Sequence, residues 1–436
     1  MLSCATSTVS IRDIDTAVNQ TDFPAAVRVI EISQAGKRPL YNERNAISLF
    51  LDIGLLEHYA GNYAASSRHL QNAERLIEEA YTKSITQGFA TFIVNDNMRD
   101  YPGEDFEDIY INVFNALNYY KRGDIEGALV EIRKLTISSG KLNMLPQRHN
   151  FTDPNTGESL SEITYRETGV SDLPSTKPVE FSNSALARYL SALFYQANRD
   201  FDSARIEFDQ VHHAYRTNRN IYRGPVPNAV EEARNVPNDM ARLNLISFSG
   251  LSPIKEEQRF SFPFILSGNS SNISLRLPVL VRRPNMITRV EVVVGNTGAF
   301  DLELIEDISA VVQETYNARF NSILLKTYIR TLMKHVGAGI ATTLITGDDE
   351  SSGREALGIA TAIASMIAIE VSERADTRMA RFLPGKAFIG GINLNPGTYS
   401  VTVNYYNGNR IVYRDVHNNV IVNQRGLNLL QSVKLN

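Results

Sequence analysis

A chain of 436 residues with a net charge of −4 offers nucleic acid no basic surface. Hydrophobic residues make up 43% of the sequence and charged residues 21%, as in a globular protein of roughly two or three domains. One cysteine and seven histidines exclude an internal disulfide and a cysteine-rich zinc site. No run of about 18 apolar residues predicts a membrane-spanning helix. We therefore expect no nucleic-acid partner, metal or cofactor.

Residues 1–10 form the expected N-terminal tether, which contains the single cysteine. Leu2-Ser3-Cys4 followed by small residues resembles the end of a bacterial lipoprotein signal peptide, in which the cysteine is acylated. The charged and apolar parts of such a signal do not precede it. Either Cys4 is a lipidation site in a chain whose true start lies upstream, or it is a chance buried cysteine. The first interpretation places the protein at the periplasmic face of the outer membrane.

A pattern of apolar and small residues recurs four times between residues 11 and 222. In each copy an aromatic or aliphatic residue is followed three positions later by Ala or Ser, and four positions further by an apolar residue. This spacing is typical of the second helix of a tetratricopeptide (TPR) hairpin, where a small residue lets two helices approach closely. The copies are Phe23-Ala26-Ile30, Tyr63-Ser66-Leu70, Ile125-Ala128-Ile132 and Phe201-Ala204-Phe208.

Each copy follows a short polar or Gly-containing break in the sequence. Matching small and aromatic positions lie in the helix that precedes each break. Gly54 falls where the repeat places its glycine, and alanine–tyrosine pairs precede the third and fourth breaks. We therefore predict a TPR-like helical repeat domain over residues 11–222. The predicted repeat-packing residues are Gly54, Tyr63, Ala116, Tyr119, Ala128, Ala192, Tyr195, Ala204 and Phe208.

The copies are unevenly spaced, which predicts inserts between the hairpins. We expect these inserts over residues 81–105 and 138–182, and the second is rich in Pro, Gly, Ser and Thr. The first ends in the acidic stretch 100–105, directly before a helix that opens at Phe106. Acidic residues at a helix start stabilise its dipole, so capping is the expected role and a Ca²⁺ site is the alternative.

Residues 223–259 are expected to be a connector that contains a short polar helix over 228–245. From residue 260 onward apolar and polar residues alternate, which predicts strands over 260–303 and 386–435. We predict that residues 260–436 form an antiparallel β-sandwich. The fold class is thus α+β, with the helical repeats first and the sandwich second.

A helical insertion over residues 305–371 interrupts the predicted sandwich. Its second part, 333–371, contains two apolar arms rich in Gly and Ala around an acidic loop. Small residues on both arms favour a tightly packed helical hairpin, and contact with a membrane is the alternative.

Several short motifs resemble an uncharacterised family of bacterial lipoproteins with N-terminal tetratricopeptide-like repeats. Besides Leu2-Ser3-Cys4 and the hairpin turns, they include Tyr101-Pro102-Gly103-Glu104-Asp105-Phe106, Gly250 through Lys255, Ala375-Asp376-Thr377-Arg378 and Leu394-Asn395-Pro396-Gly397-Thr398-Tyr399. The resemblance implies a lipid-anchored protein that faces the periplasm. It implies no activity and no catalytic residues.

The sequence contains no motif of a known catalytic site. Gly-x-Ser-x-Gly, His-Glu-x-x-His and the phosphate-binding loop are all missing. The adjacent pair His212-His213 would point about 100° apart on a helix, so it does not form a shared metal site. We therefore predict a protein that is not an enzyme.

Two functions remain open. In the first, the protein is an envelope scaffold or adaptor within a larger assembly or oligomer, and Tyr41, Tyr59 and Tyr110 line a groove that binds a protein or peptide. In the second, the β-sandwich binds glycan or peptidoglycan through tyrosines such as Tyr405 and Tyr406. Consecutive residues of a strand face opposite sides, so only one of these two can be exposed on a given face.

Overall fold

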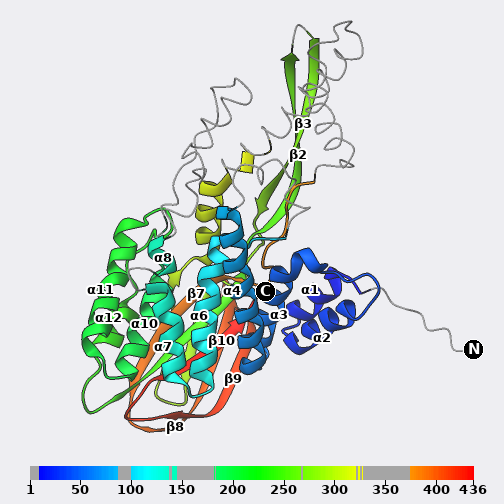
Figure 1. Cartoon of the computed structure of the whole chain (residues 1–436). Helices are drawn as coiled ribbons and strands as arrows, with labels where there is room; N and C mark the ends of the chain where they lie inside the picture. The colour runs from blue at the N-terminus through cyan, green and yellow to red at the C-terminus, as the bar shows by residue number, and fades with distance from the viewer. Residues whose placement is uncertain are drawn as a thin grey trace, which may run out of the picture.

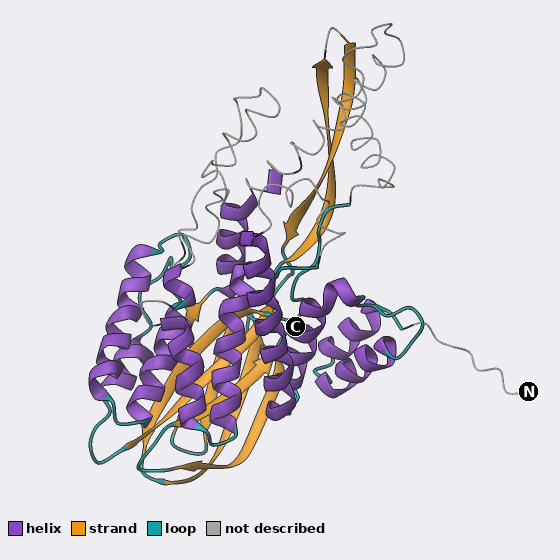
Figure 2. Ribbon diagram, viewed as in Figure 1, coloured by secondary structure: helices purple, strands orange, loops and turns teal. Residues whose placement is uncertain are grey.

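The computed structural model describes residues 9–86, 100–136, 140–144, 181, 183–266, 269–320, 323–324, 327 and 374–436. Within them the N-terminal part is helical and the C-terminal part contains the sheets, as the sequence predicts. Helices lie along one face of the strands in Figure 1, and Figure 2 separates the two kinds of element by colour. The broad fold class is therefore α+β.

Most helices of the N-terminal part pair into hairpins. The pairs are α1 (Ile11–Asn19) with α2 (Phe23–Gln34), α3 (Ala46–Tyr59) with α4 (Tyr63–Thr86), α6 (Asp105–Lys121) with α7 (Ile125–Thr136), and α10 (Ala185–Ala197) with α11 (Phe201–Thr217). Successive pairs also touch, through α2 and α3, α4 and α6, and α7 and α10. Shorter helices are η1 (Glu43–Asn45), α8 (Lys141–Met144) and α12 (Asn228–Arg234).

The four hairpins share one turn geometry. Two residues before the second helix, each turn has a residue with positive φ, and these residues are Thr21, Gly61, Gly123 and Arg199. The next amide N–H then donates to the carbonyl oxygen five residues back, at 2.9 Å in every hairpin. This arrangement closes the C-terminus of the first helix and satisfies its last carbonyls. The sequence breaks that separate the predicted helices are therefore copies of a single turn.

Close contact within the second hairpin depends on a glycine. A Cβ atom on Gly54 of α3 would lie 2.7 Å from Leu70 Cδ2 and 3.3 Å from Leu70 N on α4. Ser66 Oγ donates to the Gly54 carbonyl at 2.6 Å, which also requires close backbones. Of the other predicted packing residues, Tyr63 and Tyr119 are half-buried and the rest are buried: Ala116, Ala128, Ala192, Tyr195, Ala204 and Phe208.

The strands form two four-stranded sheets and a separate hairpin. Sheet 1 has the order β10-β1-β7-β6 and contains β1 (Ala241–Leu251), β6 (Glu303–Glu306), β7 (Pro384–Leu394) and β10 (Asn428–Lys434). Sheet 2 has the order β5-β4-β8-β9 and contains β4 (Arg289–Val294), β5 (Gly298–Asp301), β8 (Gly397–Asn407) and β9 (Arg410–Val422). The hairpin consists of β2 (Ile254–Leu266) and β3 (Asn269–Val281), and it projects from the body in Figure 1.

Two features of sheet 1 differ from the prediction. Its strand β1 lies in the range expected as a connector, and the helix expected over 228–245 ends at Arg234. In addition, β1 pairs with β10 in parallel, so the strands are not all antiparallel. The sequence conceals β1 because polar residues such as Asn244 and Ser247 occupy both of its faces.

Sheet 1 is covered on both faces, which explains the continuous burial of β1. Its even-numbered residues Ile246 and Phe248 join the cluster formed by the helices, where Phe248 lies 5.1 Å from the Phe114 ring of α6. Its odd-numbered residues Leu243 and Leu245 pack instead with Val292, Val403 and their neighbours of sheet 2. The described chain is thus layered as helices, sheet 1 and sheet 2.

The predicted insertion is described only at its start. Residues 305–306 belong to β6, and a helix follows over 308–320. On this helix Tyr316 donates its hydroxyl to the Pro278 carbonyl at the base of the β2–β3 hairpin. The predicted hairpin 333–371 lies outside the described residues. Within the described residues, every helix is too short or too polar to span a membrane.

Replacing Gly54 with alanine should destabilise the fold by about 1–3 kcal/mol, because the new methyl group meets Leu70 inside a packed hairpin. Chemical denaturation measures this change in the free energy of unfolding. Gly224→Ala is the matched control, because a Cβ at Gly224 has no heavy atom within 4 Å. Equal stability of the two variants would show that α3 and α4 do not require glycine at this contact.

Candidate functional site

The three tyrosines predicted to line a groove are occupied by contacts within the chain. Tyr110 is 1% exposed and donates to Glu306 Oε1 at 2.6 Å. Tyr41 is 9% exposed and donates to Asp52 Oδ2 at 2.6 Å, while Tyr59 donates to the Phe382 carbonyl at 3.0 Å. Tyr41 and Tyr110 are therefore buried and do not line an open groove in this structure, while Tyr59 is half-buried. An apolar helix flank predicts burial, but the sequence pattern does not reveal which segments of the chain cover it: α3 for Tyr41, residue 382 for Tyr59 and β6 for Tyr110.

Glu306 fastens the helices to sheet 1. Its buried carboxylate, at the end of β6, accepts hydrogen bonds from the hydroxyls of Tyr110, Tyr222 and Ser184, and from the Leu186 amide. Burial raises its pKa, although these four donors act in the opposite direction. The donors come from α6, α10 and the chain beside them, so one carboxylate joins two hairpins to the sheet.

A second buried connection runs through His58 of α3. Asn118 donates its Nδ2 to Ser66 Oγ at 2.8 Å, which leaves Asn118 Oδ1 to accept from His58 Nδ1 at 2.6 Å. The other ring nitrogen, Nε2, then accepts from Gln431 Nε2 of β10 at 2.6 Å. Burial lowers the pKa of His58 to about 4, so the ring is neutral at neutral pH. Both ring nitrogens are thus bonded to amide side chains, so this histidine is a structural link.

The densest polar contacts surround residues 374–383, which we call the strap. The strap directly precedes β7. Two consecutive strap amides donate to buried carboxylates on different helices: Ala380 N–H to Glu107 of α6, and Arg381 N–H to Asp52 of α3 at 2.6 Å. The strap also receives a hydrogen bond from the Tyr59 hydroxyl at the Phe382 carbonyl. Two hairpins thereby hold a segment that is remote from them in sequence.

Ion pairs surround the strap where it passes the β2–β3 hairpin. Lys255 at the start of β2 pairs with Glu104 and donates to the Arg378 carbonyl at 3.1 Å. Arg319 pairs with Glu104 at 2.7 Å, and Arg378 pairs with Asp376 at 2.7 Å. The strap, the helix 308–320 and the base of the β2–β3 hairpin are therefore joined at one place.

The sequence offered one signal for these residues that our prediction did not use. Asp52 is a lone carboxylate within the apolar stretch 46–56, and Glu107 lies in a helix whose first fourteen residues are all buried. A buried acid needs hydrogen-bond donors, so such positions indicate polar networks inside the fold. The predicted capping role of the acidic stretch is confirmed in part, because Glu104 and Glu107 form a capping box at the start of α6.

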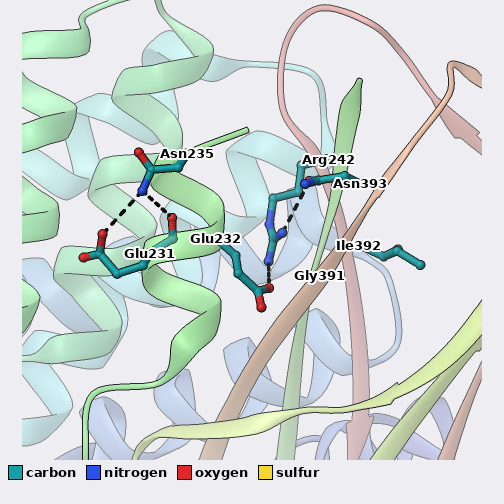
Figure 3. A pocket seen from close by; sticks show the side chains of 7 residues that line it. All are labelled: Glu231, Glu232, Asn235, Arg242, Gly391, Ile392 and Asn393. Atoms are coloured by element: carbon teal, nitrogen blue, oxygen red, sulfur yellow. Dashed lines mark hydrogen bonds and ion pairs between the residues drawn. The ribbon is translucent and has the colours of Figure 1, made fainter. Parts of the chain in front are cut away.

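A surface depression of about 570 Å³ lies between α12 and the β1–β7 pair (Figure 3). The guanidinium of Arg242 points toward it and binds Glu232 Oε2 at 2.9 Å, with a longer contact to Asn393 Oδ1 at 3.4 Å. Gly391 permits this position, because a Cβ there would lie 2.9 Å from the guanidinium. Arg242 and Glu232 of the depression thus pair with each other, and Glu231 pairs with His212 of α11. The charged groups that line the depression form no nucleophile–base pair.

The tyrosines of the glycan hypothesis face different environments. Tyr405 is fully buried between the sheets, where its hydroxyl meets Ser247 and Ser432. Tyr406 lies on the outer face of sheet 2, and the Arg289 guanidinium covers its ring at 3.8 Å from the centroid. Neither ring is an open aromatic platform for a sugar.

Two further predictions concern metal binding and the lipidation of Cys4. In the described part of the chain, no group of three or more His, Cys, Asp or Glu side chains is arranged to hold a metal ion. Cys4 lies outside the described residues, whereas the acidic stretch 100–105, which was the alternative Ca²⁺ site, lies within them.

Comparisons with known proteins do not assign the chain to a family. No protein-family model matches it, and no curated protein is similar to it in sequence.

The stability that His58 confers should depend on pH. Its folded pKa of about 4 lies below the ordinary value of 6.5, so the unfolded chain binds a proton more readily as pH falls. The stabilisation is complete above about pH 6.5 and should decrease by about 2–3 kcal/mol between pH 7 and pH 4.5. The measurement compares the free energies of unfolding of the wild type and His58→Gln at both pH values.

The acids that also titrate in this range are common to both proteins and cancel in the difference. Exposed His213→Gln serves as the control and should show a constant difference from the wild type. A difference between wild type and His58→Gln that does not change with pH would contradict a neutral, buried His58.

Proposed function

We propose that the protein is a non-enzymatic envelope scaffold, which binds a protein or peptide partner through a TPR-like helical repeat domain and docks into an outer-membrane or periplasmic assembly; a β-sandwich is its second domain. One observation carries the proposal: the same turn closes four stacked hairpins. Repeated helical hairpins build extended surfaces for other polypeptides. The hydrophobic cluster shared by sheets 1 and 2 supports the sandwich, with the parallel β1–β10 pair as a variation.

The partner surface that we propose is the outer flank of the hairpins. Sheet 1 packs on the inner side of α3, α6 and α10, so this side holds the chain's own residues. The outer helices instead carry well-exposed apolar side chains between charged ones. These are Ile32 of α2 (62% exposed), Val130 of α7 (51%), and Phe201 and Ile206 of α11 (66% and 50%). Such exposed apolar groups within a polar rim are typical of protein contacts.

A photo-crosslinking amino acid at Val130 or Ile206 should attach the partner in the cell that naturally makes the protein. Val416 on the outer face of sheet 2 is the matched control, because it is also 51% exposed. We expect a discrete adduct, resolved by electrophoresis and mass spectrometry, at the outer-helix positions and not at Val416. Adducts at all three positions, or only at Val416, would contradict the proposed surface.

Membrane attachment would come from Cys4, by the lipoprotein signal that its neighbours resemble. Cys4→Ser, introduced in the complete natural gene, should move the protein from the membrane fraction to the soluble fraction and abolish incorporation of a labelled fatty acid. Ser3→Ala is the control and should leave the distribution unchanged. Unaltered membrane partitioning of Cys4→Ser would refute the lipid anchor while leaving the scaffold proposal intact.

A further inference from the structure

The strap is held by a symmetrical pair of carboxylates. Glu107 of α6 binds the Ala380 amide and accepts the Tyr101 hydroxyl at 2.8 Å. Asp52 of α3 binds the Arg381 amide and accepts the Tyr41 hydroxyl at 2.6 Å. Each carboxylate therefore accepts one tyrosine hydroxyl and holds one strap amide, and Glu107 also accepts the Glu104 amide at 2.8 Å. Both acids are 1% exposed.

The positive charges near Glu107 are engaged by other acids. Lys255 of β2 and Arg319 of the helix 308–320 pair with Glu104. Within the strap, Arg378 pairs with Asp376, whose carboxylate is a further negative charge near this site. Glu104 itself repels a negative charge on Glu107. In the part of the chain that the structure describes, Glu107 forms no ion pair.

Asp52 has a similar environment, although two arginines approach it. The Arg381 side chain pairs with Asp15 of α1 at 2.6 Å, and Arg283 is a further positive charge near Asp52. The neighbouring Tyr59 and Tyr41 are neutral. Among the described residues Asp52, like Glu107, has hydrogen-bond donors but no ion pair at contact distance. A negative charge on either acid is thus costly while the strap covers it.

We propose that Asp52 and Glu107 form a proton-operated latch: a proton on either carboxyl tightens the strap against α3 and α6, and loss of both protons loosens it. A protonated carboxyl still offers its carbonyl oxygen to the strap amide, and its O–H donates a hydrogen bond to the tyrosine oxygen. Release of the strap would expose both acids to water, where they ionise with their ordinary strength. The closed state therefore binds protons more tightly than the open state.

The direction of the pH effect follows from this difference. Burial raises the pKa of Asp52 to about 6, and burial together with Glu104 raises the pKa of Glu107 to about 7. In the open state their pKa values return toward 3.8 and 4.5. Between the open-state and closed-state pKa values, the closed state holds more protons than the open state. Acidification from pH 7 to pH 5 therefore favours closure. Lys255 and Arg378 connect the strap to the β2–β3 hairpin, so the latch also controls how firmly that hairpin is anchored.

Hydrogen–deuterium exchange of the full-length protein tests the latch. Exchange of the amides in peptides covering 376–383 is measured between pH 5 and pH 8 and corrected for the chemical exchange rate. In the wild type, the opening constant should fall at least about tenfold from pH 7 to pH 5 and level off above pH 7. In Asp52→Asn/Glu107→Gln, which imitates the protonated acids, it should change less than about twofold.

Peptides from β8 give the internal reference for global unfolding, and Glu291→Gln on the outer face of sheet 2 is the control variant. If the double variant does not fold, Glu107→Gln alone should still reduce the change between pH 6 and pH 7 from about tenfold to about twofold, the part that Asp52 contributes. Three results would overturn the latch: strap exchange that is independent of pH in the wild type, the same pH dependence in the double variant, or equal changes in the strap and β8. The test does not depend on the proposed scaffold function.

Discussion

The structure depends above all on the packing of sheet 1 between two layers. Its strands β1 and β7 contribute alternate side chains to the helices on one face and to sheet 2 on the other. A strand buried on both faces has no surface for solvent, so its polar residues need partners inside the fold. The contacts of Arg242 with Glu232 and of Ser247 with Tyr405 meet this need. The helical repeats therefore have their inner side filled by their own chain.

Buried polar side chains connect these layers at positions where apolar packing alone would not specify a register. Glu306 joins α6 and α10 to the end of β6, and the His58 network joins α3 and α6 to β10. The strap is held in the same manner by Asp52 and Glu107. Leaving one of these groups without its partners costs about 1–3 kcal/mol or more. The hydrophobic clusters provide stability, and these polar networks in addition select one arrangement of the helices on the sheet.

This arrangement changes which surfaces are available for function. Because the inner side is filled, the outer helices, the outer face of sheet 2 and the projecting β2–β3 hairpin are the parts that face outward (Figure 2). The strap and Lys255 anchor the base of that hairpin to α6, so the helical hairpins and the projection are mechanically connected. A scaffold built in this way would combine a rigid body with one extension whose attachment depends on a few charged groups.

The sequence by itself determined the helical hairpins, because a small residue at a fixed distance from a turn is a local requirement of close helix packing. It also determined most strands after residue 260, since alternation records which face is buried. It missed β1, whose two buried faces remove that alternation, and it did not reveal that Tyr41, Tyr59 and Tyr110 are covered. Only the tertiary structure decided these points and brought Asp52 and Glu107 to residues 380 and 381. Contacts between segments hundreds of residues apart depend on how the layers dock, and no local pattern encodes that docking.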